Sequence, residues 1–449
     1  MLTLFIYLYK YLKMKWMVFV FSLFSLAVLS QEGFHLDSNK NKLTIPFTYI
    51  NNLIFIKAQV NDVPMTFLLD TGVEETILFS LEDVAEARFL NTEKVKLKGL
   101  GSADYVEGLK SVGNTIIIEK NFIDRQHTVY VILDEDFNIS SGLGIPVNGI
   151  LGAQFFKDHI VEINYITHKI YVYRNEGKSI RQITKKYKKF EISIEKNKPY
   201  IQADLIMDTK AITSKLLIDT GNSDALWLFQ NKIDSTLIPK KYFEDFLGRG
   251  FSGEVYGKRA KLHKLNFDNF EFEAPYVAFP DTVSIRHVNM VLNRVGSVGA
   301  EILKRFSVIF DYKNQNIYLK PNSRFKTPFY LNMSGIEIHH DGLQWVQEKV
   351  ELKTNNERDG TQVYKGEFNY KFSLKPIFKI YSLRPDSPAV LAGLQKGDEL
   401  ISINRKKAYN YTLQEIYDIL KSEEGKKIIL EIKRKNNILK YTFYLKSAL

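Results

Sequence analysis

The sequence predicts a mainly β protein of two similar lobes related by a pseudo-two-fold axis, followed by a smaller α+β domain. Its 449 residues are enough for about three domains. Short alternating apolar runs, rich in β-branched residues, dominate the chain, and helical patterns are few before residue 412. One stretch, an apolar strand running into Asp-Thr-Gly, occurs twice, at 67–72 and 216–221.

Each copy of this stretch reads as a buried strand that ends in a tight turn at glycine. The turns carry Asp70 and Asp219, which are 149 residues apart. A carboxylate at the edge of a core is costly unless it is hydrogen-bonded or has a task. Two such sites in corresponding places therefore indicate a functional pair.

The repeat extends beyond the turns. Glycine-rich hairpins follow each copy at nearly the same offset, and Ile150-Leu151-Gly152 matches Ser297-Val298-Gly299. This period is too long for a solenoid, so it predicts two lobes facing each other, with both aspartates at the axis. The hairpins are candidate flaps that close over a substrate, with ordinary surface hairpins as the alternative; the flap candidates are Gly99, Gly101, Tyr105, Gly248, Gly250 and Tyr256.

Two adjacent carboxylates cannot both ionise cheaply, so Asp70 and Asp219 are expected to share a proton. The ionised member can take a proton from a water, while the protonated member hydrogen-bonds a peptide carbonyl. Thr71 and Thr220 can bond across the axis and lock the turns. Gly72 and Gly221 let a backbone amide approach each carboxylate.

With these motifs, residues 44–325 resemble an aspartic protease of the pepsin and retropepsin type with both lobes in one chain. The whole chain resembles the bacterial aspartyl protease family proteins that add a C-terminal PDZ domain. The resemblance implies an endopeptidase with Asp70 and Asp219 as catalytic residues and no cofactor. The family usually has Ser, Thr or Ala after Asp-Thr-Gly, whereas this chain has Val73 and Asn222, and Ser297 replaces a hydrophobic residue.

The last part of the chain carries Ser387-Pro388-Ala389, Ala392-Gly393-Leu394 and Gly397-Asp398, then a Thr412-x-x-Glu415 capping box before a helical apolar stripe. This order resembles a PDZ domain of the bacterial type, which implies binding of an extended peptide or a C-terminus. The expected carboxylate-binding loop at 365–372 has no Gly-Leu-Gly-Phe-like sequence, so a docking or structural role is left open.

The predicted organisation starts with a signal peptide at 1–30, because a basic segment precedes a fourteen-residue apolar run; a membrane anchor is the alternative. We therefore expect export to the periplasm or secretion, and no long inhibitory pro-segment before residue 45. The return to the second Asp-Thr-Gly should pass through a long turn at 207–214. The predicted domains are lobe 1 at 31–175, a solvated basic linker at 176–190, lobe 2 at 191–325 and the PDZ domain at 334–449.

Composition narrows the chemistry. The chain has no cysteine, which excludes disulfides, thiol nucleophiles and zinc–thiolate sites. Its net charge of +11 is concentrated at the N-terminus and in the linker, and predicts no nucleic-acid partner. No metal is expected: His339-His340-Asp341 reads as an exposed turn, since neighbours on a strand face opposite ways.

Two rival functions follow from the same residues. Gly221-Asn222-Ser223-Asp224 faintly resembles the nucleophile turn of bacterial serine proteases, but no histidine-first motif accompanies it. The stronger alternative is a catalytically inactive protein that binds peptides without cutting them. Retention of both aspartates favours the enzyme, because an unused buried pair of acids is a liability.

Overall fold

The computed structural model of this chain describes residues 33–37, 40–79, 81, 86–101, 105–133, 137, 139–174, 177–207, 210–234, 238–250, 252–288, 290–358 and 361–449. At 177–179, 349–358 and 361–369 it describes the backbone alone. The predicted signal peptide or anchor at 1–30 lies outside the described residues. Within the described ranges, no helix is long and apolar enough to cross a membrane.

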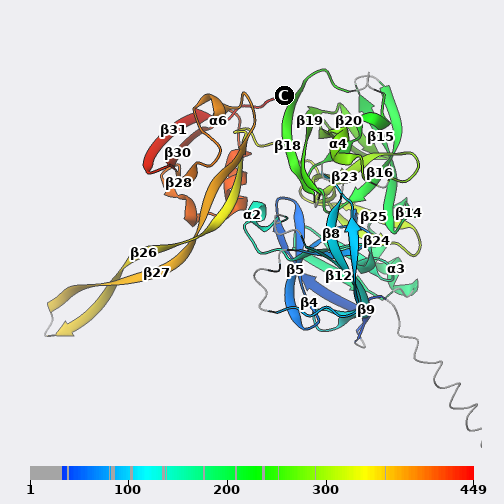
Figure 1. Cartoon of the computed structure of the whole chain (residues 1–449), viewed down its shortest axis with the longest axis horizontal. Coiled ribbons are helices and arrows are strands. Elements are labelled where there is room, and N and C mark those ends of the chain that lie inside the picture. Colours follow the sequence, from blue (N-terminus) through cyan, green and yellow to red (C-terminus); the bar gives the residue numbers. More distant parts are fainter. Residues whose placement is uncertain are drawn as a thin grey trace, which may run out of the picture.

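The fold is mainly β, as predicted, with two lobes and a C-terminal domain beside them (Figure 1). In lobe 1, β4 (Leu53–Val60) and β5 (Val63–Leu69) form a hairpin that ends at Asp70, and β10 (Gly149–Leu151) runs parallel to β5. The same sheet holds β1 (His35–Leu36), β3 (Thr48–Ile50), β6 (Thr76–Leu78), β7 (Thr92–Leu97), β8 (Val106–Ile118) and β9 (Phe122–Ile132); α2 (Ser140–Leu143) and η1 (Ala153–Phe155) flank β10.

Lobe 2 repeats this arrangement. The hairpin of β15 (Lys198–Met207) and β16 (Lys210–Asp219) ends at the second aspartate, and β23 (Arg294–Gly299) runs parallel to β16. The long turn predicted at 207–214 is wrong, because paired strands reach to 207 and resume at 210. The remaining elements are β14 (Ser193–Glu195), β17 (Leu226–Leu228), η2 (Gln230–Lys232), β18 (Tyr242–Gly250), β19 (Gly253–Lys261), β20 (Lys264–Phe267), β21 (Phe270–Glu273), β22 (Tyr276–Pro280), α4 (Thr282–Ile285) and α5 (Ala300–Leu303).

A third sheet joins the lobes behind the two turns. Its described strands follow the order β13-β25-β24-β11-β12-β2, and β11 pairs with β24 across the seam between the lobes. The strands are β2 (Lys42–Pro46), β11 (Ile160–Asn164), β12 (Lys169–Tyr173), β13 (Lys188–Glu191), β24 (Phe306–Asp311) and β25 (Asn316–Pro321). One apolar core runs through both lobes and this shared sheet.

The basic stretch 176–190 differs from the expected solvated connector. It contains the helix α3 (Gly177–Thr184) and most of β13, which pairs with β25. Phe190 packs beside Phe270 with 5.8 Å between ring centroids. In 187–190, two aromatic residues flank a pair of lysines, and lysine is common on edge strands; charge counting alone did not reveal this strand.

The C-terminal domain has its own apolar core. Helix α7 (Leu413–Leu420) begins at the predicted capping box of Thr412 and Glu415. A long hairpin of β26 (Ile336–Arg358) and β27 (Thr361–Leu383) projects away from the lobes (Figure 1). The loop expected at 365–372 is wrong, since these residues lie in β27 and pair with β26; the domain is completed by α6 (Pro388–Leu391), β28 (Glu399–Ile403), β29 (Lys406–Lys407), η4 (Ala408–Asn410), β30 (Lys427–Arg434) and β31 (Asn437–Tyr444).

Candidate active site

The two Asp-Thr-Gly turns meet at the axis between the lobes. The backbone N–H of Thr71 donates to Oγ1 of Thr220, and the N–H of Thr220 donates to Oγ1 of Thr71, each at 3.0 Å. Each hydroxyl then donates to the opposite strand, Thr71 to the carbonyl of Ile218 at 2.7 Å and Thr220 to that of Leu69 at 2.9 Å. Both threonines are fully buried, so this set of bonds fixes the spacing of the turns.

The carboxylates lie next to each other across the axis. Gly72 donates its N–H to Oδ1 of Asp70 at 2.6 Å, and Gly221 donates to Oδ1 of Asp219 at 3.2 Å. A Cβ atom at Gly72 would lie 2.9 Å from Cγ of Asp219, and one at Gly221 only 2.2 Å from Cγ of Asp70. Each glycine therefore lies against the other lobe's carboxylate, where no side chain fits.

Burial and proximity make the two acids unequal. Burial, followed by the charge of Asp219, raises the pKa of Asp70 to about 8. Burial also raises the pKa of Asp219, but the charges of Arg294 and Lys198 oppose the rise. The pair is therefore expected to hold one shared proton from mildly acidic to neutral pH.

The two residues that follow the Asp-Thr-Gly turns, Val73 and Asn222, differ from the usual family pattern, and both use their backbone carbonyls in hydrogen bonds. The carbonyl of Val73 accepts from the N–H of Ala153 at 3.0 Å, and the carbonyl of Asn222 accepts from the N–H of Ala300 at 2.7 Å. The Asn222 side chain also donates to Oγ of Ser297 at 3.5 Å. The two unusual residues of lobe 2 thus contact each other, and the backbone N–H of Asn222 gives a hydrogen bond that lowers the pKa of Asp219.

A cleft of about 1420 Å³ opens above the aspartates. Two hairpins, β7–β8 of lobe 1 and β18–β19 of lobe 2, meet over it. Ser252 donates its N–H to the carbonyl of Leu100 at 2.9 Å, and Gly99 donates to Oγ of Ser252 at 3.2 Å. A Cβ atom at Gly250 would lie 2.3 Å from that same carbonyl oxygen, and one at Gly101 2.1 Å from the carbonyl carbon of Ser252. Glycine is required where the tips touch.

The predicted flap residues do not all reach the cleft. Gly99, Gly248, Gly250 and Tyr256 line it. Gly101 and Tyr105 do not line it, and the half-exposed ring of Tyr105 lies under Nζ of Lys96 at 4.1 Å. The tips of the hairpins therefore meet at the cleft, but their two tyrosines are not equivalent.

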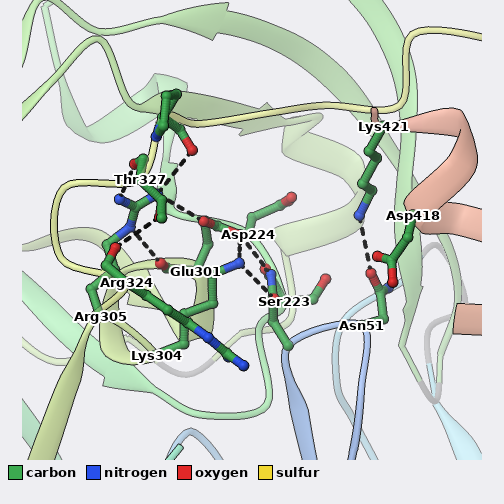
Figure 2. Close-up of polar contacts among 12 residues, drawn as sticks. Asn51, Ser223, Asp224, Glu301, Lys304, Arg305, Arg324, Thr327, Asp418 and Lys421 are labelled. Carbon is green, nitrogen blue, oxygen red and sulfur yellow. Dashed lines mark hydrogen bonds and ion pairs between the residues drawn. The ribbon is translucent and has the colours of Figure 1, made fainter. Parts of the chain in front are cut away.

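The turn Asn51-Asn52 joins three parts of the chain (Figure 2). Asn52 donates from Nδ2 to the carbonyl of Ser223 at 2.8 Å and to Oε2 of Glu301 at 2.9 Å. Asn51 accepts at Oδ1 from Nζ of Lys421, the C-cap residue of α7, at 3.3 Å. Sequence reasoning missed this turn, whose only signal is an Asn-Asn pair between two strands.

The linker into the C-terminal domain is held in place by hydrogen bonds from Arg305. Arg305, 1% exposed, donates to the carbonyls of Phe325 and Thr327 and pairs with Glu301 at 3.0 Å (Figure 2). Its guanidinium also lies 3.8 Å from the ring centre of Phe329. The chain between the lobes and the last domain therefore has a fixed course.

The C-terminal domain forms one wall of the cleft. Tyr381 of β27 donates its hydroxyl to Glu254 of the lobe 2 hairpin, which also accepts from Tyr256 at 2.8 Å. On the lobe 1 side, a Cβ atom at Gly142 of α2 would lie 3.2 Å from Nε2 of His339, and one at Gly144 would lie 3.3 Å from Cβ of Leu413. Lobe 1 thus packs on both β26 and α7, the two elements between which a peptide would bind in a PDZ domain.

The side chains of the run His339-His340-Asp341 contact residues of β27. His339 stacks on Tyr381 at 3.8 Å, His340 packs on Phe378, and Asp341 pairs with Lys379. These residues lie on or beside β26 instead of in the exposed turn we expected. In the described parts of the chain, no group of three or more His, Cys, Asp or Glu could hold a metal ion.

One histidine network was missed by sequence reasoning. His127 contacts Oδ2 of Asp124 through Nδ1 and Oγ1 of Thr76 through Nε2, both at 2.7 Å. The three groups resemble a nucleophilic triad, but all are buried, and none lines the cleft. We assign this network to the support of β6 and β9 in lobe 1.

A comparison with known families agrees with the C-terminal part of the fold. Fold and site together define a two-lobed β protein with paired Asp-Thr-Gly turns and a C-terminal PDZ domain. Residues 379–434 match the family model of the PDZ domain. Among solved structures, the chain is similar to an aspartic proteinase from Irpex lacteus, with 12% identity, a TM-score of 0.42, and coverage of 64% of this chain and 99% of that one. No curated protein matches the sequence.

Proposed function

We propose that this protein is an aspartic endopeptidase that hydrolyses peptide bonds with a water held between Asp70 and Asp219. The observation that carries the proposal is the pair of cross-bonded Asp-Thr-Gly turns, which hold two carboxylates side by side in the cleft, Asp70 buried and Asp219 partly buried. A merely structural acid pair in this position would be destabilising without a compensating use.

The reaction follows from the shared proton. The ionised aspartate takes a proton from the water as the water oxygen bonds to the peptide carbonyl carbon. The protonated aspartate gives its proton to the carbonyl oxygen, and a neutral tetrahedral diol forms. Collapse returns a proton to the leaving nitrogen and breaks the C–N bond. The flaps exclude bulk water and orient the peptide.

The C-terminal domain is proposed to dock a peptide or partner protein, in line with the general behaviour of PDZ domains. Because lobe 1 packs on β26 and α7, a ligand in that groove has to displace α2. We further propose that the protein is exported, and membrane-attached only if its N-terminal segment is retained.

The test is cleavage of a denatured protein mixture by residues 31–449 from pH 3 to 8, beside Asp70→Asn and Asp219→Asn. We expect cleavage by the wild type and none by either variant. A pepstatin-like transition-state mimic should raise the melting temperature of the wild type by mass action. Equal behaviour of all three proteins would instead favour a peptide-binding protein without catalysis.

A further inference from the structure

The pseudo-two-fold symmetry of the lobes is broken by charge beside the aspartates. In lobe 2, Tyr200 of β15 faces Leu217 of β16, so continuing this register by two residues places Lys198 opposite Asp219. In lobe 1, Phe55 faces Leu68, and the same continuation places Leu53 opposite Asp70. Lys198 and Leu53 both line the cleft. A cation in one lobe thus corresponds to an apolar side chain in the other.

A second position repeats the asymmetry. Gly296 of β23 lies beside Leu216, and Gly149 of β10 lies beside Phe67 in the same parallel arrangement. Two residues before each glycine, lobe 2 has Arg294 and lobe 1 has Val147. Arg294 lines the cleft and is 7% exposed, whereas Val147 is fully buried. Both cations therefore belong to lobe 2, and both counterparts in lobe 1 are apolar.

Arg294 is held in place by its surroundings. Its Nε donates to the carbonyl of Gly296 at 3.0 Å, and its guanidinium lies 5.1 Å from the ring centre of Phe229. A buried guanidinium is costly unless a nearby negative charge offsets its desolvation. The charge of Asp219 acts on Arg294, together with the phenol of Tyr200.

We propose that Lys198 and Arg294 are positioning residues that make the aspartates unequal: Asp219 carries the negative charge and acts as the base, and Asp70 holds the shared proton and acts as the acid. This inference rests on the proposed function and assigns the roles within it. A cation near a carboxylate favours its ionised form, and here both cations stand on the side of Asp219.

The surrounding charges agree with this assignment. Of the two cations, Arg294 lowers the pKa of Asp219 more than Lys198 does. Lys198 is the one of the two that lowers the pKa of Asp70. Three other titratable groups interact with the two aspartates and the two cations. Glu74 interacts with Lys198, the phenol of Tyr200 with Arg294, and the phenol of Tyr312 with Asp70. Glu74 partly offsets Lys198, which leaves Arg294 as the more selective of the two cations.

In the assigned reaction, the water gives its proton to Asp219 as its oxygen bonds to the carbonyl carbon. Asp70 gives its proton to the carbonyl oxygen as the C=O π bond opens. After addition, Asp219 is protonated and Asp70 is ionised. Asp219 then protonates the leaving nitrogen, and Asp70 recovers a proton from the diol as the C–N bond breaks. Charge and protons balance over the cycle.

The test is the pH profile of kcat/KM from pH 3 to 10 for the wild type, Lys198→Met and Arg294→Met. Loss of Arg294 should move the acid limb to higher pH by about one unit, because Asp219 becomes easier to protonate. Lys198→Met should move both limbs. Lys264→Met, which removes a lysine of β20 paired with Glu271 and Glu273, is the control and should keep the wild-type profile.

Two further variants keep the assignment testable if Lys198→Met or Arg294→Met misfolds or loses activity. Arg294→Lys retains the charge and should restore the acid limb. The double change Leu53→Lys with Lys198→Leu transfers one cation to lobe 1 and should narrow the difference between the two carboxyl pKa values. Carbon-13 NMR of labelled aspartates reads those values without substrate.

The outcomes separate the two proposals. If Asp70→Asn and Asp219→Asn still cleave, the proposed function fails. If both are inert while Lys198→Met and Arg294→Met fold and keep the wild-type pH profile, only the assignment of roles fails. A lower carboxyl pKa at Asp70 than at Asp219 in the NMR titration would also overturn that assignment.

Discussion

Asn52 of lobe 1 donates a hydrogen bond of 2.8 Å to the carbonyl oxygen of Ser223, four residues after Asp219. Its neighbour Asn51 is bonded to Lys421 and, through its backbone N–H, to Gln414 of α7 at 2.5 Å. Both asparagines have positive φ, 47° and 68°, which this residue type tolerates in a tight turn. A single two-residue turn therefore connects the PDZ domain with the second Asp-Thr-Gly turn.

Replacing Asn52 with glycine keeps the backbone turn and removes the bonds to Ser223 and Glu301. We expect a loss of about 1–3 kcal/mol in the free energy of unfolding, because partly buried partners lose their hydrogen bonds. We also expect kcat to fall more than KM rises. Asn51→Gly is the matched control, since it loses only the Lys421 contact and should leave kcat near the wild-type value; steady-state kinetics and urea unfolding check both.

The stability of the wild type should fall as pH rises through the neutral range. Asp70 has a folded pKa of about 8 against 3.8 for the free group, so the folded state holds a proton that the unfolded state releases. The stabilisation from this proton is complete below pH 3.8 and is lost as pH rises towards 8, at up to about 1.4 kcal/mol per pH unit.

Asp70→Asn removes that titration, so its unfolding free energy should change less between pH 4 and 8 than that of the wild type. Urea unfolding at several pH values measures the difference. Parallel curves for the two proteins would show that Asp70 is not the group that holds the proton.

Gly250→Ala should part the flap tips, since its Cβ would lie 2.3 Å from the carbonyl oxygen of Leu100. We expect KM to rise several-fold and amide hydrogen exchange to speed up at 252–258. Tyr105→Phe is the comparison, because this ring lies outside the cleft and should leave KM unchanged. An unchanged KM in Gly250→Ala would mean that substrate binding does not need the closed tips.

Arg305→Met should loosen the linker to the PDZ domain. The substitution keeps much of the apolar packing but removes a buried guanidinium that binds three linker carbonyls and Glu301. We expect a loss of about 2–4 kcal/mol and faster proteolysis at 325–332. Arg324→Met is the control, because its guanidinium lies 5.5 Å from the ring centre of Tyr49 and does not bind the linker carbonyls. Similar proteolysis of both variants would contradict this function of Arg305.

Much of the fold and the position of the acid pair followed from the sequence, because both depend on local pattern. An apolar strand that ends in Asp-Thr-Gly specifies its own turn, and repetition of that stretch specifies the pseudo-symmetry. Thr71 and Thr220 were expected to bond across the axis, and they do. The capping box at Thr412 is likewise a local signal.

Contacts between distant segments were not predictable in this way. The course of β13 depends on an edge offered by β25, more than a hundred residues later. The extent of β26 and β27 depends on mutual pairing, which a search for a short loop at 365–372 could not reveal. The Asn52–Ser223 bond spans 171 residues, and its single short-range signal is a turn with many possible partners.

The shared sheet divides evenly at the seam between the lobes: β2, β12 and β11 precede residue 174, and β13, β25 and β24 follow residue 187. Cutting the chain within α3 would leave two fragments, each with three of these strands and an open edge shaped by the other. Backbone hydrogen bonds between β11 and β24 would draw the fragments together, and each would bring one aspartate. The single polypeptide thus contains a complete interface between two halves, which makes it a suitable starting point for a split protein restored by fragment complementation.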